Sequence, residues 1–148
     1  MKQFHNILFV SNGIGEETEA LQHAIQLAVD NKATLDILII CPPFPNNLDE
    51  YKNSYETFLI EKMQQTIKSA KASLSLPNKK PDIKLEIEWG TTPDIRIIQH
   101  VLHHSYDLIV KMAENSDSSK GFKALDMALL RKCPCTLFLY RPTNRNET

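Results

Sequence analysis

Apolar residues follow two alternating patterns along this chain, which are short continuous runs and longer stretches with a spacing of three and four residues. Short runs bounded by polar residues, glycine or proline are typical of strands buried on both faces of a parallel sheet. They cover Asn6–Val10, Thr34–Cys41, Asp107–Val110 and Thr136–Tyr140. A fifth run, Ile83–Trp89, alternates apolar and charged residues, which predicts an edge strand with one solvated face.

The stretches with helical spacing predict four helices, one between each pair of successive strands. They cover residues 16–31, 48–76, the segment that begins at Pro93, and 122–132. On the long second helix we expect Tyr51, Tyr55 and Phe58 to pack in the core. The buried stripe of the third helix is expected to consist of Ile95, Ile98, Val101 and Leu102.

Strands and helices that alternate in this way require a parallel sheet, because each connection must cross over the sheet. The fold class is therefore α/β, an open five-stranded parallel sheet with helices on both faces. The pattern is continuous, so residues 1–148 are expected to form a single domain.

Composition and charge narrow the functional classes. The 17 basic and 18 acidic residues nearly balance, which gives no broad basic face for nucleic acid. The apolar runs are too short to cross a bilayer. Three cysteines do not make a secreted disulfide framework, and the first strand follows the N-terminus with no signal-peptide pattern. We expect a cytoplasmic protein with no membrane contact.

In an open α/β sheet, ligands bind beyond the carboxyl ends of the strands where the strand order reverses. The turn Ser11–Gly13 follows the first strand, and the loop 111–124 joins the fourth strand to the last helix. The two are expected to converge there and to form a pocket for a small ligand. The alternative is that these loops only close the domain.

Several segments in order resemble the universal stress protein family. They are Ile7–Gly13, Glu19–Ala28, Trp89-Gly90 followed by Pro93, Asp107–Val110 and Leu129–Leu139. Lys111-Met112-Ala113 and the Arg131–Pro134 ending look most like the E-type branch, whose members are usually tandem pairs, whereas this chain would be a single unit. The resemblance implies the adenine-nucleotide α-hydrolase-like fold with strand order 3-2-1-4-5. It also implies a homodimer through the last strand, which consists of Thr136, Leu137, Phe138, Leu139 and Tyr140.

The resemblance also implies where a nucleotide would bind. Family members that bind ATP carry an aspartate after the first strand and a glycine-rich motif after the fourth. Here Asn12 replaces the aspartate, Met112 or Ala113 stands at the first glycine, and Lys123-Ala124 stands where glycine and serine are usual. Side chains at glycine positions would stand between the backbone amides and the phosphates.

Other residues could still serve such a pocket. The candidate nucleotide-binding residues are Asn12, Gly13, Ile40, Cys41, Lys111, Met112, Lys123 and Ala124. Ile40 and Cys41 would act by position, through the backbone near a base. Lys111, Lys120 and Lys123 could supply positive charge to an anion.

Histidine and cysteine pairs offer weaker candidates for metal sensing. His100 and His104 share a helical face, with His103 beside them, but the sequence supplies no third ligand motif. We expect these rings to be solvated or partly packed near the helix end. Cys133 and Cys135 flank Pro134, and burial as small apolar residues is the default interpretation. No metal is therefore expected.

Two functional hypotheses result, and neither assigns catalytic residues. The first is a non-catalytic, dimeric signalling or binding module of the stress response, with an unidentified protein partner, no cofactor and a degenerate nucleotide site. The second is a switch that binds ATP or AMP, with weak or no ATPase activity.

Overall fold

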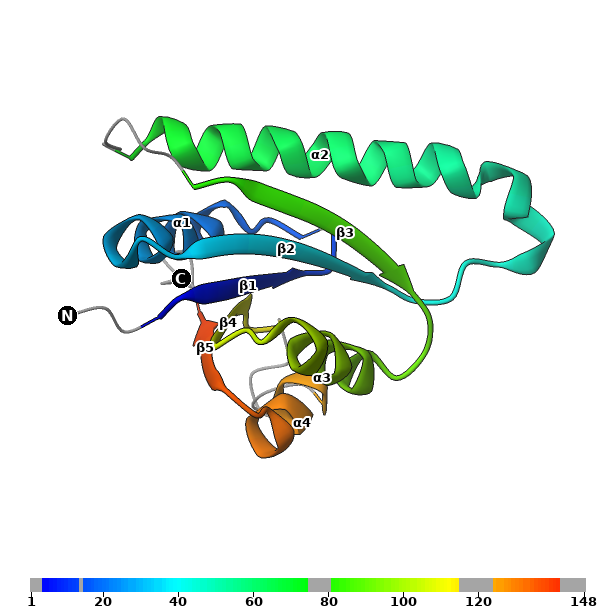
Figure 1. The fold of residues 1–148 in the computed structure, drawn as a ribbon. Coiled ribbons are helices and arrows are strands. Elements are labelled where there is room, and N and C mark those ends of the chain that lie inside the picture. Colours follow the sequence, from blue (N-terminus) through cyan, green and yellow to red (C-terminus); the bar gives the residue numbers. More distant parts are fainter. Residues whose placement is uncertain (1–3, 14, 75–80, 115–123, 142–148) are drawn as a thin grey trace, which may run out of the picture.

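The computed structural model describes residues 4–13, 15–74, 81–114 and 124–141 of the 148 residues. Its elements are β1 (Asn6–Ser11), α1 (Thr18–Asn31), β2 (Thr34–Cys41), the 3-10 helix η1 (Asn46–Tyr51), α2 (Lys52–Ala72), β3 (Ile83–Trp89), α3 (Pro93–His104), β4 (Leu108–Met112), α4 (Ala124–Lys132) and β5 (Thr136–Tyr140). These strands form one parallel sheet in the order β3-β2-β1-β4-β5 (Figure 1). The predicted α/β class and the strand order implied by the resemblance are confirmed.

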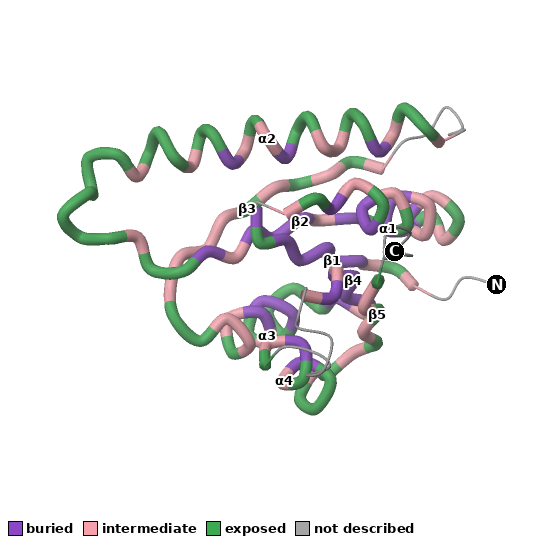
Figure 2. The backbone as a smooth tube through the Cα atoms, turned by 180° about the vertical axis from the view of Figure 1, so that it is seen from behind, coloured by how far each residue is buried: buried purple, intermediate pink, exposed green. Residues whose placement is uncertain are grey.

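Helices cover both faces of the sheet, with α1 and α2 on one face and α3 and α4 on the other (Figure 1). Successive side chains of a strand point to opposite faces, so Ile7 and Phe9 pack toward α1 while Leu8 and Val10 pack toward α3 and α4. Each such side chain is fully buried, which contributes about 1.5–3 kcal/mol. The buried residues therefore follow the central strands and the inward faces of the helices (Figure 2).

Strand β3 lies at one edge of the sheet, as its alternating sequence predicted. Ile83, Leu85 and Ile87 pack against the core under α1 and α2, whereas the charged residues between them face the side of α3. Strand β5 forms the opposite edge and pairs with β4 from Leu108 opposite Thr136 to Met112 opposite Tyr140.

The second helix differs from its prediction at the N-terminal end. Instead of starting at Leu48, the chain first forms η1, inside which Leu48 has non-helical angles, and α2 begins at Lys52. The expectation that Tyr51, Tyr55 and Phe58 lie in the core is wrong, because all three are exposed. The 21 residues of α2 extend about 32 Å. The seven-residue strand β3 beneath them spans only about 23 Å, so the first turns overhang the sheet.

The predicted buried stripe of the third helix is correct for Val101 and wrong for Ile95 and Leu102. Ile97, His100 and Val101 are buried, while Ile95 is 45% and Leu102 is 63% exposed. Ile98 lies between these extremes and packs against the core. Apolar residues occur on more than one side of this helix, so spacing alone did not determine which side faces the sheet.

No helix in the described part of the chain is long and apolar enough to cross a membrane.

Candidate functional site

The ends of β1 and β4 lie side by side at the centre of the sheet, because Val10 pairs with Lys111. This register brings the turn after β1 next to Lys111 and Met112, at the point where the strand order reverses. In a parallel α/β sheet, the backbone amides of the loops at this position can bind an anion. Whether an anion can bind here depends on which groups already accept hydrogen bonds from those amides.

The turn after β1 is organised by Glu17, which immediately precedes α1. Its carboxylate accepts a hydrogen bond from the Ser11 hydroxyl at 2.6 Å and one from the Asn12 amide at 3.4 Å. Burial raises the pKa of Glu17, and the bonds from Ser11 and Asn12 and the charge of Lys111 oppose that rise. Glu17 is buried, at 7% exposure.

Lys111 forms a buried ion pair with Asp126 of α4. Its Nζ lies 2.8 Å from Asp126 Oδ1 and 3.4 Å from Glu114 Oε2. Lys111 is 5% exposed and Asp126 is fully buried. The second Asp126 oxygen accepts the Glu114 amide at 2.7 Å. The predicted cation is therefore engaged inside the protein.

These two carboxylates bind backbone amides at the carboxyl ends of β1 and β4. Glu17 binds the amide that follows β1, and Asp126 binds the amide of Glu114, just after β4. A carboxylate that accepts backbone N–H groups satisfies them as a phosphate oxygen would. Among the residues that the structure describes at this end of the sheet, the Asn12 and Glu114 amides are thus bound by carboxylates of the chain itself.

Asn12 and Gly13 have structural partners in the same turn. The Asn12 side-chain oxygen accepts the Gly15 amide at 2.9 Å, and the Gly13 amide donates to the Ser11 hydroxyl at 2.8 Å. Gly13 has φ +83°, and an added Cβ would lie 3.0 Å from Ile39 and 3.1 Å from Leu59. Glycine is required there for backbone conformation and for close packing.

Ile40 and Cys41 extend past the end of β1, because Ser11 pairs with Ile39. The Cys41 carbonyl accepts the Gly90 amide at 3.0 Å. Its thiol is buried, and burial raises the pKa of Cys41. Cys41 therefore acts through its backbone at the end of β2 and not through a reactive thiol.

The remaining candidates are separated from this network. Met112 is half-buried and packs against the core beneath α1 and α2, while Ala124 is the exposed first residue of α4. Lys120 and Lys123 lie outside the described residues.

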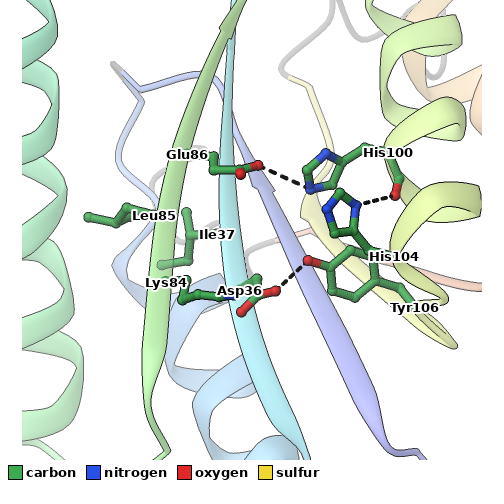
Figure 3. A pocket seen from close by; sticks show the side chains of 8 residues that line it. All are labelled: Asp36, Ile37, Lys84, Leu85, Glu86, His100, His104 and Tyr106. Atoms are coloured by element: carbon green, nitrogen blue, oxygen red, sulfur yellow. Dashed lines mark hydrogen bonds and ion pairs between the residues drawn. The ribbon is translucent and has the colours of Figure 1, made fainter.

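A cavity of about 250 Å³ lies between β2, β3 and α3 (Figure 3). Its lining consists of Asp36, Ile37, Lys84, Leu85, Glu86, His100, His104 and Tyr106. The Tyr106 hydroxyl donates to the Asp36 carboxylate. Burial and this bond raise the pKa of Tyr106.

His100 is the unexpected residue in this cavity, since we predicted a solvated or partly packed ring and the ring is buried. Its two nitrogens face Glu86 Oε1 at 3.5 Å and Glu88 Oε2 at 3.6 Å. Burial, followed by the neighbouring His104, lowers the pKa of His100, and Glu86, Glu88 and Asp36 partly oppose this. Among the described residues no three His, Cys, Asp or Glu side chains are placed to hold a metal ion.

The family model for universal stress proteins matches residues 3–141. The chain belongs to the universal stress protein family. The resemblance drawn from the sequence is confirmed.

A curated relative, the universal stress protein E homolog of Haemophilus influenzae, is 29% identical over 153 residues. That alignment covers 94% of this chain and 48% of the relative. The chain spans about half the length of the curated universal stress proteins that it matches along nearly its whole length.

Solved universal stress proteins share the fold. UspA from Lactobacillus plantarum superposes with a TM-score of 0.76 at 20% identity, over 95% of this chain and all of that one. A universal stress protein in complex with cAMP superposes with a TM-score of 0.62 at 15% identity, over 93% of this chain and 97% of that one. At these identities the likeness shows the fold.

Sequence reasoning missed Glu17 and Asp126, although one signal pointed to them. Lys111 belongs to a strand that is otherwise apolar and buried on both faces, and a buried cation requires a carboxylate partner. Asp126 lies one residue after Leu125 and three before Leu129, among the apolar positions of α4. A carboxylate at such a position is buried and therefore requires a partner.

Proposed function

We propose that this protein is a non-catalytic, homodimeric signalling or binding module of the stress response, without the family's usual recognition of ATP. The observation that carries the proposal is the buried Lys111–Asp126 pair at the end of β4. The Glu17 carboxylate on the Asn12 amide repeats the arrangement at the end of β1.

Binding of ATP phosphates at this point would have to displace carboxylates that are part of the chain. Removing one partner of a buried ion pair costs about 3–5 kcal/mol. That cost would weaken binding roughly a hundred-fold to several thousand-fold. Glu17, Glu114 and Asp126 would also repel the phosphates, whose negative charge has the same sign.

The side chains at the strand ends also support a non-catalytic role. Ser11 and Glu17 form a hydroxyl–carboxyl pair that resembles a nucleophile with its base. However, Ser11 is 1% exposed, and its oxygen also accepts the Gly13 amide. A substrate would have no access to this hydroxyl, so the pair is better explained as a support for the turn.

Dimerisation through β5 is supported by the difference between the two sheet edges. Strand β3 carries Lys84, Glu86 and Glu88, and charged residues protect an edge strand from pairing with another chain. Strand β5 consists of Thr136, Leu137, Phe138, Leu139 and Tyr140 and offers no charge. Pairing with a second copy would satisfy its outer backbone groups and form a symmetric interface.

The ATP part of the proposal is tested by thermal unfolding of the purified protein with ATP–Mg²⁺, ADP and AMP up to millimolar concentration. We expect no concentration-dependent rise in Tm, because a ligand that does not bind the native state cannot stabilise it. The structurally similar protein in complex with cAMP, titrated with cAMP, provides the positive control. Stoichiometric ATP in the purified protein, or a saturable rise in Tm, would contradict the proposal.

The second candidate is a nucleotide switch, and the solved complex with cAMP favours it as a fold-level analogy. A ligand with less phosphate charge would suffer less repulsion from the carboxylates. Stabilisation by adenosine or cAMP but not by ATP would therefore indicate a base site near Ile40 and Cys41 without a phosphate site. If none of these ligands raises the Tm, this candidate function is excluded.

A further inference from the structure

Two free cysteines stand close together where α4 is joined to β5. Cys133 directly follows the last residue of α4, and Cys135 directly precedes the first residue of β5. Their Sγ atoms are 3.8 Å apart, and both side chains are only partly buried. The pair is therefore both close and accessible to a small reagent.

The backbone on each side fixes this arrangement. The Cys133 amide donates to the Leu129 carbonyl at 2.9 Å, which continues the helical bonding of α4. The Cys135 thiol lies 3.6 Å from the Thr136 carbonyl, and β5 begins at Thr136. Between them the ring of Pro134 restricts φ. The chain bends at Pro134 and Cys135, and both cysteine side chains pack against the core near α3 and α4.

The spacing permits a covalent bond between the two sulfurs. A fully extended chain would place the Cα atoms of residues i and i+2 roughly 6.6–6.8 Å apart, which is the upper end of the range found across disulfides. The segment bends at Pro134 and Cys135, so the Cα atoms of Cys133 and Cys135 lie within this limit. A bond requires the sulfurs to approach from 3.8 Å to about 2.05 Å, which side-chain rotation with a small backbone adjustment can supply.

The pair is also suited to react near neutral pH. A hydrogen bond from the Cys135 thiol lowers the pKa of Cys133 to about 6. The same interaction raises the pKa of Cys135. One thiolate therefore lies beside one thiol, and thiolates are the nucleophilic form of cysteine.

We propose that Cys133 and Cys135 form a redox site that hydroperoxides oxidise to an intramolecular disulfide. The Cys133 thiolate attacks one peroxide oxygen, so an S–O bond forms, the O–O bond breaks, and the alkoxide or hydroxide that leaves takes a proton. The Cys135 sulfur then attacks the Cys133 sulfenic acid, and hydroxide leaves as water with the Cys135 proton. Two thiols and one hydroperoxide thus yield one disulfide, one alcohol or water, and one further water.

Reduction by a dithiol returns the pair to its starting state, because partly exposed disulfides are the labile ones. The proposal is independent of the nucleotide site, which lies at the other end of the β4–β5 pair, where Ala113 meets Tyr140. Cys41 provides an internal reference because it is buried and burial raises its pKa.

The test treats the fully reduced chain with one equivalent of hydrogen peroxide and follows free thiols and intact mass. We expect the loss of two thiols and two hydrogen atoms, reversal by dithiothreitol, and a peptide that contains Cys133 and Cys135 as the oxidised product. The reaction rate should already be close to its maximum at pH 7, since the Cys133 thiolate forms near pH 6.

Single serine variants separate the two roles. Cys133→Ser should lose the fast reaction, whereas Cys135→Ser should react and gain one oxygen as a sulfenic acid that dimedone traps. Cys41→Ser is the matched control and should react as the wild type does. Circular dichroism verifies that each variant is folded.

Three results would overturn the proposal. In the first, the thiols of Cys133 and Cys135 react no faster than that of Cys41. In the second, disulfides form only between chains. In the third, a tightly bound metal ion protects both thiols from oxidation.

Discussion

At the scale of single residues, the structure depends on a charged pair in a place where water is excluded. Lys111 and Asp126 lie on different elements and meet where the central strand β4 ends. The desolvation of each ion is offset by the charge of the other and by the Glu114 amide. Each ion alone would be an uncompensated buried charge.

We therefore predict that Asp126→Ala lowers the free energy of unfolding by about 3–5 kcal/mol, because it leaves Lys111 buried without its partner. Lys111→Met should have a comparable effect, since it leaves Asp126 unpaired. The double variant should lose less than the sum of the two single variants, because no buried charge remains. Urea unfolding monitored by circular dichroism measures all three.

The pair Lys132–Asp94 serves as the matched control. Its atoms lie 3.4 Å apart, but the Lys132 side chain is 53% exposed. Lys132→Met should cost no more than about 1 kcal/mol, as is usual for surface pairs. Equal losses in the free energy of unfolding for Lys111→Met and Lys132→Met would show that burial does not strengthen the Lys111–Asp126 pair.

His100 provides a second prediction at this scale, and its sign follows from burial. The pKa of His100 lies below its usual 6.5, so the unfolded chain takes up the proton before the native state does. Stability is therefore complete above about pH 6.5 and falls as the pH decreases from there through the lower pKa of the folded state. His100→Gln should make the stability profile flatter in that interval, as measured by urea unfolding between pH 7.5 and about pH 5.

The exposed His103 on the same helix is the control, and His103→Gln should retain the wild-type slope. The groups that face His100 are Glu86 and Glu88 of β3, Asp36 of β2, His104 of α3 and Tyr106, which stacks on the ring. An unchanged slope in His100→Gln would mean that these carboxylates cancel the effect of burial.

At the scale of elements, the edge strand β5 carries the prediction about assembly. Phe138 is 37% exposed on an uncharged edge strand. If two copies pair through this edge, Phe138→Glu would place like charges in the interface. We expect the wild type to elute as a dimer and Phe138→Glu as a monomer in size-exclusion chromatography with light scattering.

Leu130 on α4 is an exposed leucine outside β5, at 50% exposure, and provides the control. Leu130→Glu should remain dimeric. A monomeric wild type, or a dimer that survives Phe138→Glu but not Leu130→Glu, would move the interface away from β5.

Sequence periodicity predicted elements better than it predicted their ends and faces. Strands buried on both sides, such as β1 and β2, are recognisable because most of their positions are apolar. The overhanging start of α2 was not recognisable, because aromatic residues with helical spacing occur there without a sheet beneath them. Phe44, Tyr55 and Trp89 instead pack on one another, with ring centroids 5.2–6.1 Å apart.

At the scale of the whole molecule, the sequence predicted that the turn after β1 lies next to the end of β4. It did not predict which side chains bind the backbone amides there. The alternation of elements predicted a parallel sheet, and the family resemblance implied the strand order, which places Asn12 near Lys111. The partners Glu17 and Asp126 come from the residue before α1 and from the first turn of α4, 109 residues apart in numbering. A buried lysine in an apolar strand signals that it has an acidic partner, but which residue is the partner depends on three-dimensional packing.

The two carboxylates at the strand ends have a consequence for regulation. A diffusing metabolite occupies its receptor in proportion to its concentration, but Glu17 and Asp126 are tethered to the groups that they bind. Their effective concentration is therefore constant and insensitive to the energy charge of the cell. Under the proposed function, the output of this protein would be set by how many copies are synthesised and degraded, and not by the fraction that is loaded.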